Sequence, residues 1–310
     1  MCVRFQLFRI KIIIINNSID KLLAMKKLLL LATLLLGALS CAKDNAYEVH
    51  LGGDGNYVLA VSLLEATRGS EDSGLANIDP AAYDLRYILE VYDAVEDILV
   101  YRDFDTKDGF TPAETETSFP VRLIPGRGYN FVVWADIVRQ GSTADLCYST
   151  ESLKSVSIKT ETWTAMNELR DAYTGVAQVD GYNSGSEIAI ELIRPFAKLR
   201  VVAKEGDVAD FGGSAPKSVN FTYTTPVATA FNALYPEAMA PQSKTFTYNL
   251  ANVYGETGNK LTLFADYIFT HNPSKVQFNM VVTCEDGTSH TINVGTGVDI
   301  ERNKLTSIEK

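Results

Sequence analysis

The residue with the most definite chemistry in this sequence is Cys41, because a signal for export and lipid attachment precedes it. Met25 is followed by two lysines, then by the apolar or small residues 28–36, and residues 37–40 (Gly-Ala-Leu-Ser) lead into the cysteine. A positive start, a short apolar core and small residues at the cut make a secretory signal peptide. This core is too short for a membrane-spanning helix, which needs about 20 apolar residues. The pattern therefore predicts that Cys41 carries diacylglycerol on its thiol and becomes the mature N-terminus.

The alternative is an ordinary signal peptide that happens to be followed by a cysteine. Lipoprotein signals prefer leucine three residues before the cysteine, and this chain has Ala38 there, with Leu39 beside it. Residues 1–24 precede a signal that is complete without them, so we interpret them as upstream sequence translated from a wrong start codon. We expect the signal over 25–40 to be removed and residues 41–56 to form a short polar tether.

Groups that could do acid–base or metal chemistry are scattered along the chain. His50 lies near the tether, His271 lies in a Thr-His-Asn-Pro turn, and His290 lies at the start of a strand. No Gly-x-Ser-x-Gly elbow and no phosphate-binding loop occurs in the sequence. The glycine-rich residues 52–56 precede a strand rather than a helix, so they do not make a nucleotide cradle. We expect no enzyme activity, no cofactor and no metal site.

Two cysteines, Cys147 and Cys284, remain in the body of the mature chain. In an exported protein they could form one disulfide. They could instead be separate small hydrophobic residues in a strand-rich core. We favour the second interpretation because the two residues fall in different predicted domains. The sequence has no CxxC motif and no Cys/His spacing typical of a zinc site.

The charge balance excludes some partners. The whole chain has a formal net charge of −10, and the predicted mature part, with 22 basic and 37 acidic residues, has −15. A nucleic-acid-binding protein needs a basic patch, so we expect no nucleic-acid partner. The same charge argues against electrostatic adhesion to an anionic membrane and suits a soluble exterior domain.

The body of the chain is predicted to be β-structure almost throughout. Short runs rich in Val, Ile, Tyr, Phe and Thr are separated by Gly, Pro, Asn and Asp, which is the pattern of a sandwich or barrel. These runs are residues 57–64, 86–92, 97–102, 119–124, 129–136, 188–193, 197–203, 219–224, 245–250, 261–269, 276–284 and 291–294.

The remaining local signals are turns and two short helical segments. Residues 285–288 (Glu-Asp-Gly-Thr) predict a hairpin turn of the Asp-Gly type, and residues 125–128 (Pro-Gly-Arg-Gly) predict another turn. Apolar residues in 163–173 recur with helical spacing, so we expect a short helix there. Residues 228–234 suggest one further turn of helix.

A domain boundary is expected near residues 193–196 (Ile-Arg-Pro-Phe). A strand ends there, and Pro195 cannot donate a hydrogen bond to a central ladder. We therefore divide the mature chain into an N-terminal domain over 57–194 and a C-terminal domain over 195–310.

The order of several phrases resembles that of the fimbrillin-like lipoproteins of the Bacteroidota, relatives of type V pilus subunits and anchors. The phrases are the lipoprotein signal and residues 85–92, 120–136, 168–175, 194–202 and 300–306. The resemblance covers essentially the whole mature chain. It implies an all-β fold of two tandem transthyretin-like β-sandwich domains, with a short helix in the first. It also implies transport to the outer membrane as a lipoprotein, and cell-surface display.

In the pilins of that family a protease removes the first strand, often after an arginine, and a strand of the next subunit fills the groove. Arg68 follows the first predicted strand here and is the candidate cleavage site, although any surface loop can hold an arginine. Family members often end with a further Gly-containing strand, whereas this chain stops at residues 308–310. Its last strand is then truncated or supplied by a partner.

The sequence leaves two functions open, both non-enzymatic. The first is a pilus subunit, anchor or tip adhesin that binds other subunits by strand exchange, is held in the outer membrane through its lipid, and contacts a host or bacterial surface. The second is a glycan-binding surface lipoprotein of a polysaccharide-uptake system. Trp134 lies in an apolar run that reads as core, whereas Trp163 could be exposed for sugar stacking. A flat row of exposed aromatic residues would favour the glycan binder, and an open or swapped edge strand would favour the pilus subunit.

Overall fold

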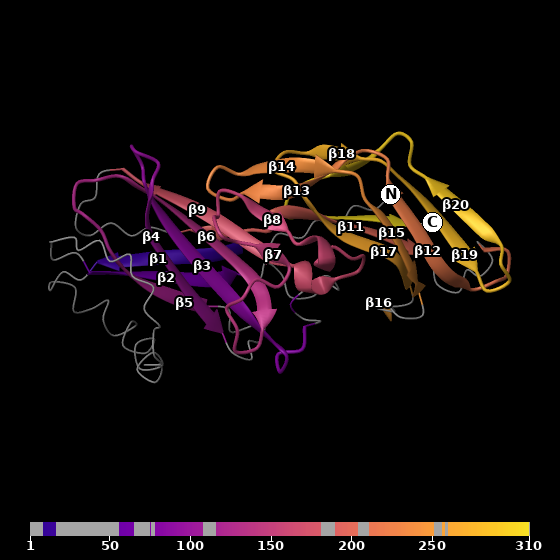
Figure 1. The fold of residues 1–310 in the computed structure, drawn as a ribbon, viewed down its shortest axis with the longest axis horizontal. Helices are drawn as coiled ribbons and strands as arrows, with labels where there is room; N and C mark the ends of the chain where they lie inside the picture. Colours follow the sequence, from indigo (N-terminus) through magenta and orange to yellow (C-terminus); the bar gives the residue numbers. More distant parts are fainter. Residues whose placement is uncertain are drawn as a thin grey trace.

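The structure is a computed structural model, and it describes residues 9–16, 56–64, 75, 78–107, 116–180, 190–203, 211–250, 256–257 and 260–309. Over these residues the chain consists of strands joined by turns, with two short 3-10 turns and no α-helix. Figure 1 shows an elongated molecule, with the earlier strands at one end and the later strands at the other. The expectation of an all-β chain of tandem sandwiches is confirmed.

The described strands carry the bounds that follow. They are β1 Arg9–Asn16, β2 Asn56–Leu64, β3 Tyr83–Asp93, β4 Leu99–Lys107, β5 Glu116–Arg122, β6 Tyr129–Arg139, β7 Tyr148–Ser149, β8 Val156–Ile158, β9 Ala172–Val179, β10 Glu191–Leu192, β11 Phe196–Ala203, β12 Pro216–Tyr223, β13 Val227–Asn232, β14 Glu237–Gln242, β15 Thr245–Asn249, β16 Glu256–Thr257, β17 Lys260–Phe269, β18 Ser274–Val276, β19 Phe278–Cys284, β20 Ser289–Asn293, β21 Val298–Ile300 and β22 Leu305–Glu309.

The first sandwich packs two four-stranded sheets against each other. One sheet has the order β10-β1-β2-β5 and the other has the order β4-β3-β6-β9. Tyr87, Leu89 and Val91 of β3 point into the core between them, as the alternation of that strand predicts. Ile88 and Tyr92, on the other face of β3, belong to the second core cluster. The sheet of β3 and β6 is therefore buried on both faces, which explains why both strands are apolar along most of their length.

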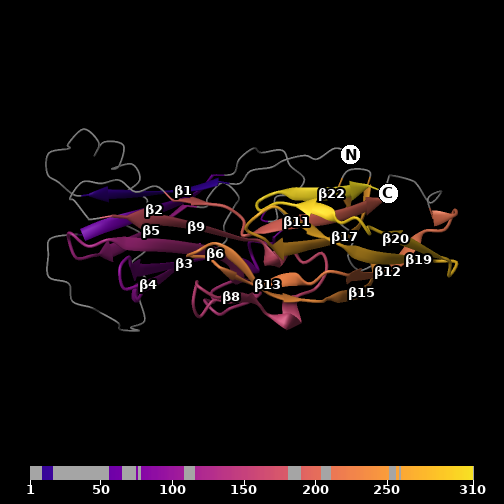
Figure 2. The ribbon, with the colours of Figure 1, turned by 90° about the horizontal axis from the view of Figure 1, so that it is seen from above.

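The second sandwich contains a larger sheet of order β22-β11-β17-β13-β8-β7, with β14 and β16 at its side, and a four-stranded sheet of order β15-β12-β19-β20. The strand β22 runs parallel to β11, whereas the other pairs in these two sheets are antiparallel. Phe221, Phe246 and Phe264 meet between the sheets, and the rings of Phe221 and Phe264 stack with centroids 3.6 Å apart. Figure 2 shows β22, β11 and β17 together on one side of this half of the molecule.

The helix predicted over 163–173 is wrong. Only two 3-10 turns form near there, Thr160–Thr162 and Glu168–Arg170, and β9 begins at Ala172. Met166 between the turns has φ 57° and donates its backbone N–H to the carbonyl of Ala265, which a helix would not allow. Tertiary pairing with β6 and β17 overrides the helical spacing of the apolar residues.

The turn of helix suggested over 228–234 is also wrong. These residues contain most of β13, which pairs with β14 on one side and β8 on the other. Phe231 in this strand is completely buried. The chain reverses after it, where the Asn232 side chain accepts a hydrogen bond from the backbone of Tyr235 at 2.9 Å.

The domain division at residues 194 and 195 stays a prediction. Strands β7 and β8 precede that point in the sequence, yet β8 pairs with β13 through Ala230 and Phe231. A segment of the predicted N-terminal domain therefore completes a sheet of the C-terminal one, as Figure 1 shows where β8 lies beside β13. The two parts share a sheet in addition to packing against each other.

Candidate interaction sites

The two residues singled out for processing, Cys41 and Arg68, lie outside the described residues, and so does His50. Cys147 and Cys284 are both buried and free, so the structure has no disulfide between them. Burial raises the pKa of the Cys147 thiol to about 11, which keeps it protonated and unreactive at neutral pH. Both behave as the small core residues that the sequence favoured.

A strand from the predicted leader occupies a position in the first sandwich. Residues Arg9–Asn16 form β1, which pairs with β2 from Arg9↔Leu64 to Asn16↔Tyr57. On its other side β1 pairs with β10 at Ile10↔Leu192 and Lys11↔Glu191. Residues 9–16 precede the predicted start at Met25, so a mature protein that begins at Cys41 lacks this strand between β2 and β10.

Buried ion pairs join the segment before β9 to strands of the second sandwich. Each charged residue of the segment has a partner there or at its border. Glu168 accepts two hydrogen bonds from Lys198, at 2.8 and 2.9 Å. Arg170 pairs with Asp266. Asp171 makes a bidentate pair with Arg194, at 2.6 and 2.7 Å.

The environment of Asp266 shows how complete these networks are. Its carboxylate also accepts hydrogen bonds from Tyr223 at 2.9 Å and from the indole of Trp163 at 3.4 Å. Burial raises the pKa of Tyr223, and the nearby Asp266 carboxylate adds to the rise, so the phenol stays a donor. Removing one partner from such a network costs more than the pair itself contributes, because the other charge stays buried. These ion pairs and hydrogen bonds therefore fix the position of the segment before β9 against the second sandwich.

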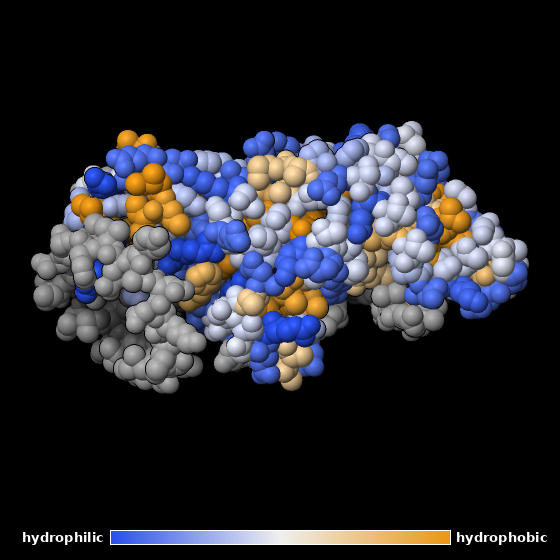
Figure 3. All heavy atoms as spheres, in the orientation of Figure 1, coloured by the Kyte–Doolittle hydropathy of each residue, from blue (hydrophilic) through white to orange (hydrophobic). Residues whose placement is uncertain are grey.

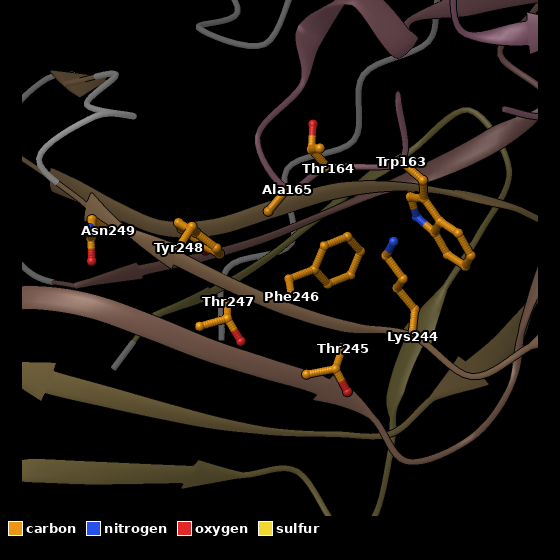
Figure 4. A pocket seen from close by; sticks show the side chains of 9 residues that line it. All are labelled: Trp163, Thr164, Ala165, Lys244, Thr245, Phe246, Thr247, Tyr248 and Asn249. Atoms are coloured by element: carbon orange, nitrogen blue, oxygen red, sulfur yellow. The ribbon is translucent and has the colours of Figure 1, made fainter. Parts of the chain in front are cut away.

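A cavity of about 530 Å³ opens beside β15, the edge strand of its sheet. One wall is the segment from Trp163 to Ala165 and the other is the strand itself with Lys244 before it. Figure 4 shows Phe246 and Tyr248 on the side of the strand that faces Trp163 and Ala165, with Thr245 and Thr247 directed the other way. The two walls are far apart in the sequence, so no local motif marks the cavity.

Lys244 is the cation of this cavity. Its ammonium lies 4.9 Å from the ring centre of Trp163 and 5.3 Å from that of Phe246. Burial lowers its pKa, and the nearby Asp266 opposes the change. The aromatic faces compensate part of the charge by cation–π attraction. Trp163 itself is buried, so the expectation that it could be exposed for sugar stacking is wrong, whereas Trp134 lies in the core as predicted.

Exposed apolar side chains gather at the turn between β3 and β4. Val95, Ile98 and Leu99 are 88%, 52% and 47% exposed. Figure 3 shows orange spheres at the upper left, where this turn projects in Figure 1. The exposed aromatic residues in the described part of the chain are Phe104 and Tyr235, which lie on different elements and form no flat row.

The described residues hold no cluster of three or more His, Cys, Asp or Glu side chains that could bind a metal ion. His271 follows β17, and His290 lies in β20, where its ring packs edge-on against Phe211. Among the described residues there is no helix with the length and apolar character to cross a membrane.

A family profile matches residues 54–310, which is most of the chain; its description is "Family of unknown function (DUF6562)". The chain belongs to this family. The matched region begins after the predicted signal and includes every described strand except β1. A search among curated proteins finds no match.

The solved structures that match this chain include proteins of Bacteroides and Parabacteroides species. A candidate cell adhesion protein of Bacteroides uniformis is 13% identical, with a TM-score of 0.44 over 77% of this chain and 90% of that one. A candidate adhesin of Bacteroides thetaiotaomicron is 14% identical (TM-score 0.41, 67% and 72% covered). A fimbrial assembly protein of Parabacteroides distasonis is 11% identical (0.39, 72% and 82%). Because each TM-score is below 0.5, the function of this chain has to be argued from its own residues.

Proposed function

We propose that this protein is a lipid-anchored surface protein of a fimbria, acting as subunit, anchor or tip adhesin, and that it joins a neighbouring subunit by exchange of a β-strand. The observation that carries the proposal is the place of β1. Residues ahead of Cys41 fill a position inside a sheet, between β2 and β10. These residues precede the predicted start at Met25, so a mature protein that begins at Cys41 lacks them and the position is open to another strand.

The vacated position suits an incoming strand. β1 is paired with β2 along its whole length of eight residues, so its removal leaves a row of backbone N–H and C=O groups without partners. A donor strand from another subunit supplies those hydrogen bonds, and alternate side chains set its register. The run Ile12-Ile13-Ile14-Ile15 that occupies the position indicates the apolar character required of the donor.

Cleavage after Arg68 would remove a second strand, β2, from the same sheet. Residues before Arg68 include β2, which pairs with β5 from Asn56↔Arg122 to Ser62↔Glu116. Loss of β2 would uncover the edge of β5 and the core residues Phe119 and Val121 that lie in it. An apolar core opened in this way is strongly driven to accept a replacement strand. Arg68 is therefore the proposed maturation site for polymerisation.

The test is the state of the native protein in outer-membrane extracts, run on gels without boiling, with N-terminal sequencing of each band. Strand exchange predicts a ladder of detergent-resistant oligomers whose mature N-terminus lies beyond residue 68. An Arg68→Ala variant should lose the ladder and keep an N-terminus blocked at Cys41. Arg139→Ala, at an exposed arginine on β6, is the matched control and should keep the ladder. A single monomer band blocked at Cys41 in the wild type would reject polymerisation by strand exchange.

A further inference from the structure

The outer face of the sheet β15-β12-β19-β20 has an unusual composition. Directly paired residues of neighbouring strands point to the same face of a sheet. The pairs Ser218↔Asn249, Asn220↔Thr247 and Thr222↔Thr245 place six hydroxyl and amide side chains side by side on β12 and β15. Within this group the Asn220 amide donates to the Thr247 hydroxyl at 3.0 Å, and the hydroxyls of Thr222 and Thr245 are 3.0 Å apart.

The pattern continues across the next two strands. Residues on β12 pair with β19, and β19 pairs with β20, so that the same face receives Asn279, Val281, Thr283, Ser289, Thr291 and Asn293. We call these twelve residues the Ser/Thr/Asn face. All of them are exposed or half-buried, whereas the residues that alternate with them, such as Phe221, Phe246 and Met280, are in the core. Eleven of the twelve side chains are Ser, Thr or Asn, and one is Val.

The face contains no charged residue, although 21% of the chain is Asp, Glu, Lys or Arg. Exposed surfaces usually carry roughly 25–35% charged residues, so twelve neutral positions together are unexpected for a face that only meets water. Charges lie at its border, where Lys217 and Glu285 form an exposed pair at 3.3 Å. The face is therefore an uncharged area on a molecule with a net charge of −10.

We propose that the Ser/Thr/Asn face binds a neutral polysaccharide. Hydroxyl and carboxamide groups both donate and accept hydrogen bonds, which matches the hydroxyls of a sugar chain. The threonine methyl groups and Val281 supply small apolar contacts between those groups. The amides of Asn279 and Asn293 and the hydroxyl of Thr291 make no side-chain hydrogen bond with described residues, so they are available to a ligand.

Other partners fit the face less well. An anionic ligand such as a nucleic acid or an acidic glycan would find no cation on it. A protein partner, including a second copy of this chain, would usually need aromatic, Met or Arg anchors, and the face has none. The cavity beside β15 also has Thr245, Thr247 and Asn249 among its lining residues, so the face reaches the rim of that cavity.

The test is native gel electrophoresis of the purified protein with and without yeast mannan, dextran, glycogen or xyloglucan in the gel, and with polygalacturonate as an acidic probe. The proposal predicts that at least one neutral polysaccharide retards the wild type and that polygalacturonate does not. The triple variant N220A/T247A/T291A should raise the dissociation constant roughly tenfold or more, because it removes three hydrogen-bonding groups. The matched variant T143A/S155A/N272A, with exposed residues on other elements than the four strands of the face, should behave as wild type.

Three results would overturn the proposal. They are no retardation by any of the four neutral polysaccharides, equal retardation of the two triple variants, and retardation by polygalacturonate alone. If the wild type sediments as a dimer and the face variant as a monomer, the face is a self-association surface instead.

This proposal depends on the proposed function in one respect only, namely that a protein at the cell surface would meet polysaccharides there. Because purified protein is used, failure of binding leaves strand exchange standing, and a missing oligomer ladder leaves the binding result standing.

Discussion

At the residue scale, Glu168 links the chain before β9 to the second sandwich. Its carboxylate accepts two hydrogen bonds from Lys198 and one from the hydroxyl of Tyr267. The side chain of Lys198 is 5% exposed, and that of Glu168 is 26% exposed. Burial opposes ionisation of Glu168, but the charge of Lys198 and the hydrogen bonds outweigh it and lower its pKa below the ordinary 4.5. The sequence places Glu168 and Lys198 thirty residues apart and gives no sign of the pair.

This lowered pKa predicts a pH-dependent contribution to stability. A carboxylate with a depressed pKa in the folded state stabilises the fold above its unfolded pKa, and this contribution is lost as the pH falls through the folded pKa. We expect Glu168→Gln to lower the free energy of unfolding by about 2 kcal/mol at pH 7, less than for a fully buried pair because Glu168 is partly exposed. The difference between variant and wild type should shrink as the pH falls below about 4.5.

Urea unfolding at a series of pH values measures this difference. Glu301→Gln removes a more exposed carboxylate, paired with Lys304 on the surface, and is the matched control. It should change stability by less than about 0.5 kcal/mol at any pH. A difference for Glu168→Gln that stays constant from pH 7 to pH 3 would show that the side chain acts by packing rather than through its charge.

At the scale of elements, the hairpins follow local turn chemistry and the segment before β9 does not. The Asp-Gly turn predicted over 285–288 joins β19 and β20, with Gly287 at φ +86° and Asp286 accepting hydrogen bonds from Thr288. The segment 163–173 has helical spacing, yet its last residues enter β9 because β6 offers a full ladder from Tyr129↔Val179 to Asp136↔Ala172. A turn needs only its own residues, whereas a strand is decided by its partner.

The hairpin turn supports a direct prediction. A side chain at Gly287 would meet no atom within 4 Å, so its cost is purely conformational. We expect Gly287→Ala to lower the free energy of unfolding by roughly 1–2 kcal/mol, the usual cost of the left-handed region for a residue with Cβ. Gly295→Ala is the control, because Gly295 has no positive φ and an added Cβ there lies 3.4 Å from Asn293. Equal stabilities of the two variants in thermal melts would contradict this account.

At the scale of the whole molecule, the two sandwiches act as one body. The sheet of β3 and β6 is covered on one face by the first core and on the other by the second, and β8 pairs across the predicted boundary with β13. Arg86 adds a buried bidentate pair with Asp136 at 2.7 and 2.9 Å on the second face. An elongated rod of this kind would suit the proposed fimbrial subunit, which must transmit force along an assembly.

Anchoring of this rod is tested with the signal itself. We expect Cys41→Ser to be absent from the outer-membrane fraction and to accumulate as an unprocessed, larger form, because it has no thiol to carry the acyl chains. Ala38→Leu, which restores the preferred residue of the signal, should stay in the membrane fraction. Fractionation and immunoblotting measure both. Membrane association of Cys41→Ser with unchanged processing would reject lipid attachment at this cysteine.

The sequence by itself determined the features that depend on neighbours along the chain. The alternation of Tyr87, Leu89 and Val91 predicted one buried face of β3, and the Asp-Gly pair predicted the β19–β20 turn. Most of the long strands follow from their own composition, because each strand must bury one or both faces whatever its partner. The proposed lipid site also depends on local order alone.

Only the tertiary structure decided which strands and side chains meet. The cavity joins Trp163 to β15, and the ion pairs join the segment of Glu168 and Arg170 to strands that follow residue 195. The Ser/Thr/Asn face exists because four strands align in one register, and a shift of one residue in any of them would bury its polar side chains. Register and partner choice are set by packing across the whole core, so no window of sequence contains them.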